Sequence, residues 1–314
     1  MRNIAIILAG GTGSRMGGGM PKQLLPLADG QTILEHSVAA FEQAKCIDEI
    51  GIVMHPDYIA RAEEMLLRNG WQKVAFIIGG GKERRESSMR AIEQVYANVE
   101  LRMKNDEGAD NLATHQPINP FDKFNHASTN QPINAATSST TNQQINPSTH
   151  QSTTNILLHD AARPFVSQRI ISDVCKALTQ HEAVTVAIPA TDTMYTIDGD
   201  FVRDIPTRSA LMCAQTPQAF RLDVIARAYA LAQQDPTGQS TDDCGVVRRY
   251  LPDTPIYIVP GDSTNRKITY REDIEGNNYQ EPASNYQGNY QEKTKDYQEN
   301  YQENIPGTTK KDFV

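Results

Sequence analysis

The sequence lacks the features that mark nucleic-acid-binding and membrane proteins. Its 314 residues carry a formal net charge of −8, and no basic stripe stands out that could contact a phosphate backbone. No apolar run is long enough to cross a bilayer, and the first 20 residues lack the basic start and apolar stretch of a secretory signal. We therefore expect a soluble, cytoplasmic protein with neither nucleic acid nor a membrane among its partners.

Cysteine is also scarce, which bears on metal binding and on the cellular compartment. The four cysteines, Cys46, Cys175, Cys213 and Cys244, are scattered along the chain. They form no C-x-x-C pair, and no histidine lies at a spacing typical of a zinc site. Such a set fits a reducing cytosol better than a disulfide framework.

The most informative stretch lies at the beginning of the chain. Residues 3–8 are almost wholly apolar, which is typical of a strand buried on both faces. A glycine-rich segment follows at residues 9–19, and glycines allow a tight turn that presents bare N–H groups to an anion. Arg15 and Lys22 add two cations, so the segment suits a triphosphate. It matches neither the P-loop nor the dinucleotide pattern, and a purely structural turn is the alternative.

Strand-like and helix-like patterns alternate through most of the chain, which predicts a parallel sheet with ligands at the carboxyl ends of its strands. Asp198 and Gly199 separate two alternating runs and predict a β-hairpin. Thr32 followed by Glu35 predicts a capping box at the start of one helix, and Asn69-Gly70 predicts the end of the next. The expected strands span residues 3–8, 49–54, 74–78, 156–158, 183–188 and 256–259, and the expected helices span residues 32–41, 58–67, 89–95, 170–178 and 222–231, with another starting near Thr241.

Two segments interrupt this alternation. Residues 104–155 are rich in Asn, Gln, Ser, Thr and Pro, and residues 276–314 repeat Asn-Tyr-Gln units. Their few apolar side chains cannot offset the entropy lost on ordering. We predict a disordered insertion and a disordered tail around a single domain made of residues 1–103 and 156–275. A partner-binding arm is the alternative reading of the insertion, although no residue favours it.

Polar residues gather after two of the later strands. The third expected strand leads into glycines and then Arg84 and Ser87, where Ser87 could also be an ordinary helix cap. The strand at residues 156–158 leads into His159 and Asp160. A carboxylate at this edge of the sheet suits Mg²⁺, a cation that prefers oxygen ligands. We interpret His159 as a packed structural histidine.

Two motifs carry a resemblance to a known family. The run A-G-G-T-G-S-R-M at residues 9–16, followed by P-K-Q at 21–23, and the run H-D-A-A-R-P at 159–164 resemble the signatures of cytidylyltransferases that act on polyol phosphates. This family includes the 2-C-methyl-D-erythritol 4-phosphate and the ribitol-5-phosphate cytidylyltransferases. The resemblance covers about residues 3–103 and 156–275.

The resemblance implies a fold and a reaction. The fold would be an α/β, Rossmann-like nucleotidyltransferase fold, with a mostly parallel sheet flanked by helices and a protruding β-hairpin arm at about residues 190–215. The reaction would transfer CMP from CTP to a polyol phosphate. The leading candidate for this acceptor is 2-C-methyl-D-erythritol 4-phosphate, in isoprenoid precursor biosynthesis. The arm would make the protein a homodimer.

The resemblance also assigns roles to individual residues. Arg15 and Lys22 would be catalytic, and Asp160 would bind Mg²⁺. Arg163 would help to order the site, although a structural ion pair is an equal alternative. The nucleotide would contact Ala9, Gly10, Gly11, Thr12, Gly13, Ser14, Gly80, Arg84, Ser87, Asp160 and Ala161, and the acceptor would be positioned by Thr193, Arg208, Thr216 and Lys267.

Three other functions compete with this one. Ribitol 5-phosphate as the acceptor is favoured by Thr264, which stands where many erythritol-phosphate enzymes have an acidic residue, and by residues 204–206. A protein that binds CTP without turnover is a second possibility, opposed by the presence of all the cations together. A nicotinamide-dependent dehydrogenase lacks support, because Met54, His55 and Pro56 end the second strand where an acidic residue would bind a ribose.

Overall fold

In this computed structural model, the described residues are 1–11, 20–106, 154–235, 237–238 and 240–275. The predicted tail and most of the predicted insertion lie outside them. The two ends of that insertion belong to regular elements, because α3 (Arg84–Asp106) continues to Asp106 and β4 (Thr154–Asp160) begins at Thr154. No helix in the described ranges is long and apolar enough to cross a membrane.

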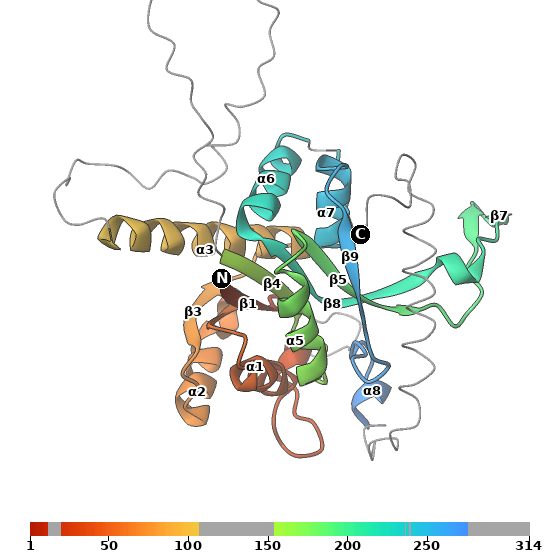
Figure 1. The fold of residues 1–314 in the computed structure, drawn as a ribbon. Coiled ribbons are helices and arrows are strands. Elements are labelled where there is room, and N and C mark those ends of the chain that lie inside the picture. The colour runs from red at the N-terminus through yellow and green to blue at the C-terminus, as the bar shows by residue number, and fades with distance from the viewer. Residues whose placement is uncertain (12–19, 107–153, 236, 239, 276–314) are drawn as a thin grey trace, which may run out of the picture.

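A seven-stranded sheet forms the centre of the domain, in the order β3-β2-β1-β4-β8-β5-β9 (Figure 1). All neighbouring strands pair in parallel except β8, which runs antiparallel to both β4 and β5. The predicted mostly parallel α/β fold is therefore confirmed. The strands not yet given are β1 (Arg2–Ala9), β2 (Glu49–Met54), β3 (Val74–Gly79), β5 (Ala183–Pro189), β8 (Met212–Arg221) and β9 (Ile256–Pro260).

Helices cover both faces of the sheet, with α1, α2 and α5 on one side and α3, α6 and α7 on the other (Figure 1). Successive side chains of a strand point to opposite faces. Ile7 of β1 accordingly joins the core cluster beneath α1, while Ile4 and Ile6 join the cluster beneath α3 and α6. The remaining helices are α1 (Ile33–Gln43), α2 (Ile59–Asn69), α5 (Gln168–Ala177), α6 (Leu222–Gln233), α7 (Asp243–Tyr250) and α8 (Glu272–Glu275), with short 3₁₀ turns η2 (Lys22–Leu24), η3 (Pro56–Tyr58) and η4 (Arg208–Ala210).

The ends of the first two helices follow from local sequence. The hydroxyl oxygen of Thr32 accepts a hydrogen bond from the backbone N–H of Glu35, and the backbone N–H of Thr32 donates one to the Glu35 carboxylate, so α1 begins with a full capping box. Gly70 ends α2 with a φ of 63°, in the left-handed region that glycine adopts without strain. Both boundaries agree with the sequence prediction.

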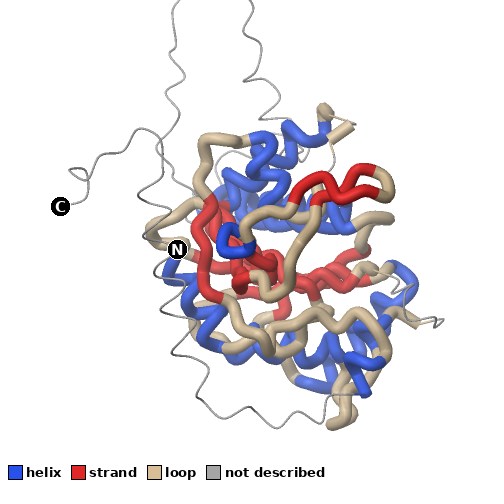
Figure 2. Tube along the Cα trace, turned by 90° about the vertical axis from the view of Figure 1, so that its right-hand side faces the viewer, coloured by secondary structure: helices blue, strands red, loops and turns tan. Residues whose placement is uncertain are grey.

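The predicted hairpin is present and projects from the body of the domain (Figure 1), and its side of the molecule faces the viewer in Figure 2. Its strands, β6 (Thr196–Asp198) and β7 (Phe201–Asp204), pair antiparallel across a turn in which Gly199 has a φ of 57°. Ile197 and Phe201 are 70% and 80% exposed, so the arm presents large apolar side chains to solvent.

Strand β8 is the one central element that the sequence patterns did not predict. Pro217 lies in its interior, and a proline normally argues against a strand in the middle of a sheet. The peptide bond between Thr216 and Pro217 is cis, and the pairing of β5 with β8 shifts register between Val184 and Val186. The register shift falls opposite residues 216–218, so the proline lies at an interruption of the pairing between β5 and β8.

Candidate nucleotide site

A cavity of about 820 Å³ opens at the carboxyl ends of β1, β3 and β4. This is the edge of an open α/β sheet where ligands usually bind. Its walls come from two glycine loops, the first beginning at residues 9–11 at the end of β1 and the second at residues 79–81 at the end of β3. The residues after β2 and β4 and the segment after β9 complete them. The lining includes Ala9, Gly10, Gly11, Lys22, Gln23, His55, Asp57, Gly80, Gly81, Arg84, Ser87, Arg90, Asp160, Ala161, Ala162, Lys267 and Thr269.

Gln23 shapes the first glycine loop. Its side chain is 3% exposed, and its Nε2 donates hydrogen bonds to the carbonyl oxygens of Ala9 and Gly11, the latter at 2.8 Å. These bonds occupy the carbonyl oxygens on one side of the backbone. Gln23 is the last residue of the P-K-Q run, but the sequence analysis did not assign it a role.

The two glycine loops approach each other closely. A Cβ atom on Gly10 would lie 3.1 Å from Oγ of Ser87 and 3.5 Å from Cα of Gly80, and one on Gly80 would lie 2.9 Å from the same Oγ. Side chains at these positions would therefore separate the loops. Ser87 Oγ also accepts a hydrogen bond from the Gly81 backbone N–H at 3.1 Å. Ser87 is buried inside α3, so it ties the second loop to the helix and is not an N-cap.

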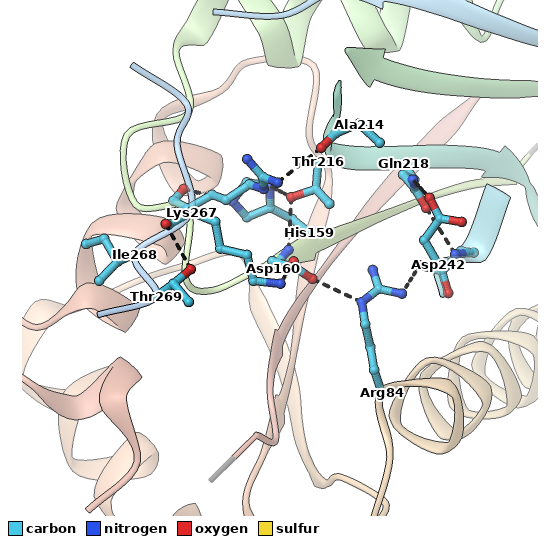
Figure 3. A network of polar contacts seen from close by, with 12 residues as sticks. Arg84, His159, Asp160, Ala214, Thr216, Gln218, Asp242, Lys267, Ile268 and Thr269 are labelled. Carbon is cyan, nitrogen blue, oxygen red and sulfur yellow. Dashed lines mark hydrogen bonds and ion pairs between the residues drawn. The ribbon is translucent and has the colours of Figure 1, made fainter. Parts of the chain in front are cut away.

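Asp160 is the central charge of the cavity (Figure 3). Its Oδ1 lies 3.1 Å from Nε of Arg84, and its Oδ2 lies 2.7 Å from Nζ of Lys267. Burial of the carboxyl opposes ionisation, but the charges of Arg84 and Lys267 outweigh it and hold the pKa of Asp160 well below its usual range. Asp160 is therefore a carboxylate at neutral pH.

The residues beneath Asp160 fix its position. The Asp160 backbone N–H donates to Oγ1 of Thr216 at 3.1 Å, and this hydroxyl also contacts Nδ1 of His159 at 3.0 Å. His159 is fully buried, its Nε2 lies 3.0 Å from the carbonyl oxygen of Arg163, and burial lowers its pKa to about 4. His159 is thus a packed neutral histidine, as expected from the sequence.

Arg163 joins three segments through backbone carbonyl groups. Its guanidinium donates to the carbonyl oxygens of Asn265, at 2.7 Å, and Ala214, at 3.2 Å. These bonds tie the loop after β4 to β8 and to the segment after β9. The contacts described for Arg163 are therefore hydrogen bonds to main-chain oxygens, and the alternative of a carboxylate ion pair is not seen among them.

Lys22 and Lys267 reach the cavity from opposite ends of the chain. Lys22 lies in η2 and donates from Nζ to the carbonyl oxygen of Ile268 at 2.6 Å. Lys267 is the residue before Ile268 and pairs with Asp160. The first loop region and the segment after β9 therefore meet at the cavity, where they deliver two ammonium groups.

Several residues predicted to bind ligands lie elsewhere. Thr193 and Arg208 are exposed and do not line the cavity, and Arg208 donates to the carbonyl oxygen of Thr191 at 3.2 Å. Thr216 lies below Asp160 and supports it. Thr12, Gly13, Ser14 and Arg15 fall outside the described residues. The cavity therefore brings together Ala9, Gly10, Gly11, Lys22, Gly80, Arg84, Ser87, Asp160, Ala161 and Lys267.

The donor set limits what kind of metal the cavity could hold. Among the described residues, no three His, Cys, Asp or Glu side chains lie close enough together to ligate one ion. Asp160 offers a single ionised carboxylate. Mg²⁺ commonly binds through one or two carboxylates, with substrate phosphates and water completing its shell. A phosphate-bound Mg²⁺ fits this site, whereas a closed structural metal site does not.

The sequence reasoning missed several residues that line or support the cavity. Arg90 donates to the carbonyl oxygens of Gly79 and Gly80, the latter at 2.9 Å, and holds the second loop from the helix side. Nothing in its sequence context indicates this contact. His55 and Asp57 also line the cavity, just after β2, where the sequence predicts no nucleotide contact.

A family model and several curated proteins are similar to this chain. The family model described as 2-C-methyl-D-erythritol 4-phosphate cytidylyltransferase (IspD) matches residues 3–141 and 137–279. A protein of that name from Thermobifida fusca is 40% identical over 278 residues, which cover 87% of this chain and 90% of the relative. A bifunctional ribulose 5-phosphate reductase/CDP-ribitol pyrophosphorylase from Haemophilus influenzae is 35% identical over 87% of this chain, but only 47% of that relative is covered.

Solved structures support the fold. A 4-diphosphocytidyl-2C-methyl-D-erythritol synthase from Anaerococcus prevotii matches with a TM-score of 0.60 and 23% identity, over 88% of this chain and 93% of that one. The Francisella tularensis 2-C-methyl-D-erythritol 4-phosphate cytidylyltransferase matches with a TM-score of 0.59 and 21% identity, over 88% and 98%. These structures show the fold, and the family model and the 40% identical relative show that the chain belongs to the 2-C-methyl-D-erythritol 4-phosphate cytidylyltransferase family.

Proposed function

We propose that the protein transfers CMP from CTP to 2-C-methyl-D-erythritol 4-phosphate, giving 4-CDP-2-C-methyl-D-erythritol and pyrophosphate, a step of isoprenoid precursor biosynthesis. The observation that carries the proposal is the convergence of Lys22, Arg84, Asp160 and Lys267 with two glycine loops around one cavity. The family membership and the names of the relatives supply the identity of the substrates.

The chemistry follows from charge. A phosphate oxygen of the acceptor attacks the α-phosphorus of CTP, a new P–O bond forms, and the bond to the β-phosphate oxygen breaks to release pyrophosphate. The attacking oxygen is already an anion at neutral pH, so no general base is needed. The problem is to bring anions together and to stabilise the additional charge at the α-phosphate. Preorganised cations such as Lys22 and Lys267 meet both demands. We assign the same role to Arg15.

Asp160 is the residue that would hold Mg²⁺ when the nucleotide is bound. The ion would neutralise phosphate charge in the triphosphate. The depressed pKa of Asp160 keeps the carboxylate ready for this role, because protonation would remove its affinity for a cation. The positions of Arg84 and Lys267 beside it supply positive charge on the protein side.

We also propose a homodimer in which the arm completes the site of the partner. Three features support it: the arm projects from the domain, it exposes Ile197 and Phe201, and it carries Arg208 and Thr193 away from their own cavity. An apolar surface of this kind is typical of an interface. We place the protein in the cytoplasm, which agrees with its free cysteines.

Ribitol 5-phosphate is the alternative acceptor. The Haemophilus relative and the small hydroxyl at Thr264 favour it. Thr264 is exposed, and its Oγ1 donates to Asp262 at 3.0 Å, so its side chain does not line the cavity. Thr264 is therefore a weak argument for ribitol 5-phosphate, because its side chain does not reach the cavity of its own chain.

A pyrophosphate-release assay tests the proposal directly. CTP, ATP, GTP and UTP are each supplied with Mg²⁺ and either polyol phosphate. Release with CTP and 2-C-methyl-D-erythritol 4-phosphate alone is the expected outcome. Faster pyrophosphate release with ribitol 5-phosphate would establish the alternative acceptor. A protein that binds CTP but releases no pyrophosphate with either acceptor would be a nucleotide-binding protein without this activity. Removing Mg²⁺ with a chelator should abolish release.

A further inference from the structure

The guanidinium of Arg84 is held by two carboxylates on opposite sides. Its Nε lies 3.1 Å from Oδ1 of Asp160 in the cavity, and its Nη1 lies 2.7 Å from Oδ2 of Asp243. Burial disfavours the charged guanidinium, but the two carboxylates outweigh this effect and raise the pKa of Arg84. An arginine has five N–H donors, so the remaining ones are available to an anion in the cavity that Arg84 lines.

The two carboxylates occupy different environments. Asp160 lines the cavity and lies between Arg84 and Lys267 (Figure 3). Asp243 is completely buried, does not line the cavity, and comes from the first turn of α7. A ligand that draws Asp160 towards a cation would weaken its bond to Arg84. The bond to Asp243 is outside the reach of that ligand.

Asp243 is itself held in place. The hydroxyl of Tyr229 donates to its Oδ1 at 2.7 Å, and its backbone N–H donates to Oε1 of Gln218 at 3.1 Å. Tyr229 lies in α6 and is 1% exposed, while Gln218 lies in β8. A buried carboxylate is costly unless it is paired and hydrogen-bonded. Tyr229 holds one oxygen of Asp243 and Gln218 holds its backbone, while the other oxygen meets Arg84.

We propose that Asp243 is a positioning residue that keeps the Arg84 guanidinium directed into the phosphate-binding cavity when Asp160 changes partner, with Tyr229 orienting Asp243. Asp243 acts only through Arg84. Without it, Arg84 has Asp160 as its one carboxylate partner among the described contacts, so the arginine would follow Asp160 and compete with any cation for the same oxygens. The inference rests on the proposed function, because it assigns Arg84 to nucleotide binding.

The test measures CTP affinity by equilibrium dialysis and turnover by pyrophosphate release. Asp243→Asn keeps the shape of the side chain and removes its charge. Residues that hold metal ligands in place change affinity or activity by about 10–100-fold. By analogy with that effect, we expect a CTP Kd weakened by about tenfold and an acceptor KM unchanged. The matched control is Asp235→Asn, which removes a carboxylate that also pairs with an arginine, Arg249, and a tyrosine, Tyr250, but neither contacts Arg84 nor lines the cavity. It should bind CTP like the wild type.

A double-mutant cycle separates positioning from general damage. If Asp243 acts through Arg84, adding Asp243→Asn to Arg84→Gln should weaken CTP binding by less than about twofold further. Losses that multiply, or an Asp243→Asn protein with wild-type affinity, would overturn the inference.

Because Asp243 is buried, thermal melting must first show that the Asp243→Asn protein folds. If it does not fold, a second variant is used. Tyr229→Phe then takes its place, since it removes only the hydroxyl that orients Asp243. We expect CTP binding weakened by about threefold or more, and no such loss on the Arg84→Gln background. Unchanged binding in Tyr229→Phe would overturn the inference. Failure of the wild type to bind CTP would instead overturn the proposed function, and this inference with it.

Discussion

Lys22 offers the sharpest separation between stability and catalysis. Its Nζ donates to the Ile268 carbonyl oxygen at 2.6 Å, a bond between residues 246 positions apart. Hydrogen bonds from charged groups contribute about 1.5–3 kcal/mol, and partial exposure reduces that to about 1 kcal/mol here. The Lys22→Ala protein should therefore melt only about 2–4 °C below the wild type.

The expected loss of activity is much larger. Removing one preorganised donor to a developing negative charge typically costs about 10²–10³ in turnover, or about 2.7–4 kcal/mol of transition-state stabilisation. Since the fold loses only about a third of that, the protein stays folded at 25 °C while its pyrophosphate release with CTP and acceptor falls by that factor. Kinetics at saturating substrate and thermal melting, on the same preparation, give both numbers.

Lys73→Ala is the matched control. Its Nζ also donates to a backbone carbonyl oxygen, that of Ala44 at 2.7 Å, but it lies far from the cavity lining. It should show a similar small decrease in melting temperature with full activity. Turnover in Lys22→Ala within tenfold of the wild type would refute the assignment of this ammonium group to the reacting phosphates.

Three further outcomes are expected. Burial lowers the pKa of His159 from 6.5 to about 4, so the neutral side chain makes its full contribution to the free energy of unfolding above pH 6.5. The free energy of unfolding should fall by roughly 3 kcal/mol as the pH drops to 4, because the unfolded state binds the proton more tightly. Urea unfolding should show that slope in the wild type and not in His159→Gln; equal slopes would contradict it. Lys267→Ala should lower kcat/KM for the acceptor by about 10²–10³ through a raised acceptor KM, and unchanged acceptor kinetics would remove Lys267 from the acceptor site. Ile197→Asp combined with Phe201→Asp should give a folded monomer by sedimentation, with a melting temperature that no longer depends on protein concentration. A persistent dimer would exclude the arm as the interface.

Local patterns predicted most of the fold because each expected element has a signal within a few residues. The apolar run at residues 3–8 became β1, and the Thr32 capping box became the start of α1. The Asp-Gly turn became the tip of the arm. Strand β8 has no such local signal, because Pro217 argues against a strand. Pairing with β4 and β5, which are distant in the sequence, makes the segment a strand.

The candidate site was predictable to the extent that it consists of backbone and charge after strands. Glycines at two strand ends and Asp160 at a third share one edge of the sheet, so their convergence follows from topology alone. Gln23, Arg90 and Asp243 are different, since each acts on another part of the site and not on the ligand. An amide, a surface arginine and a helix-start aspartate are common residues that carry no sign of such a contact.

Sequence separation explains which contacts remain hidden. The bonds that hold the cavity together join Lys22 to Ile268, Arg84 to Asp243 and Arg163 to Asn265, over 246, 159 and 102 positions. Periodicity and turn chemistry report on neighbours within about one helical turn or one strand pair, so they cannot detect these bonds. The glycine loops are detectable because the constraint acts on their own backbone. The motifs therefore mark the residues that would face the substrate, whereas the residues that would keep Arg84 and Asp160 aligned become visible only when the sheet brings α3, α7 and the segment after β9 to the same edge.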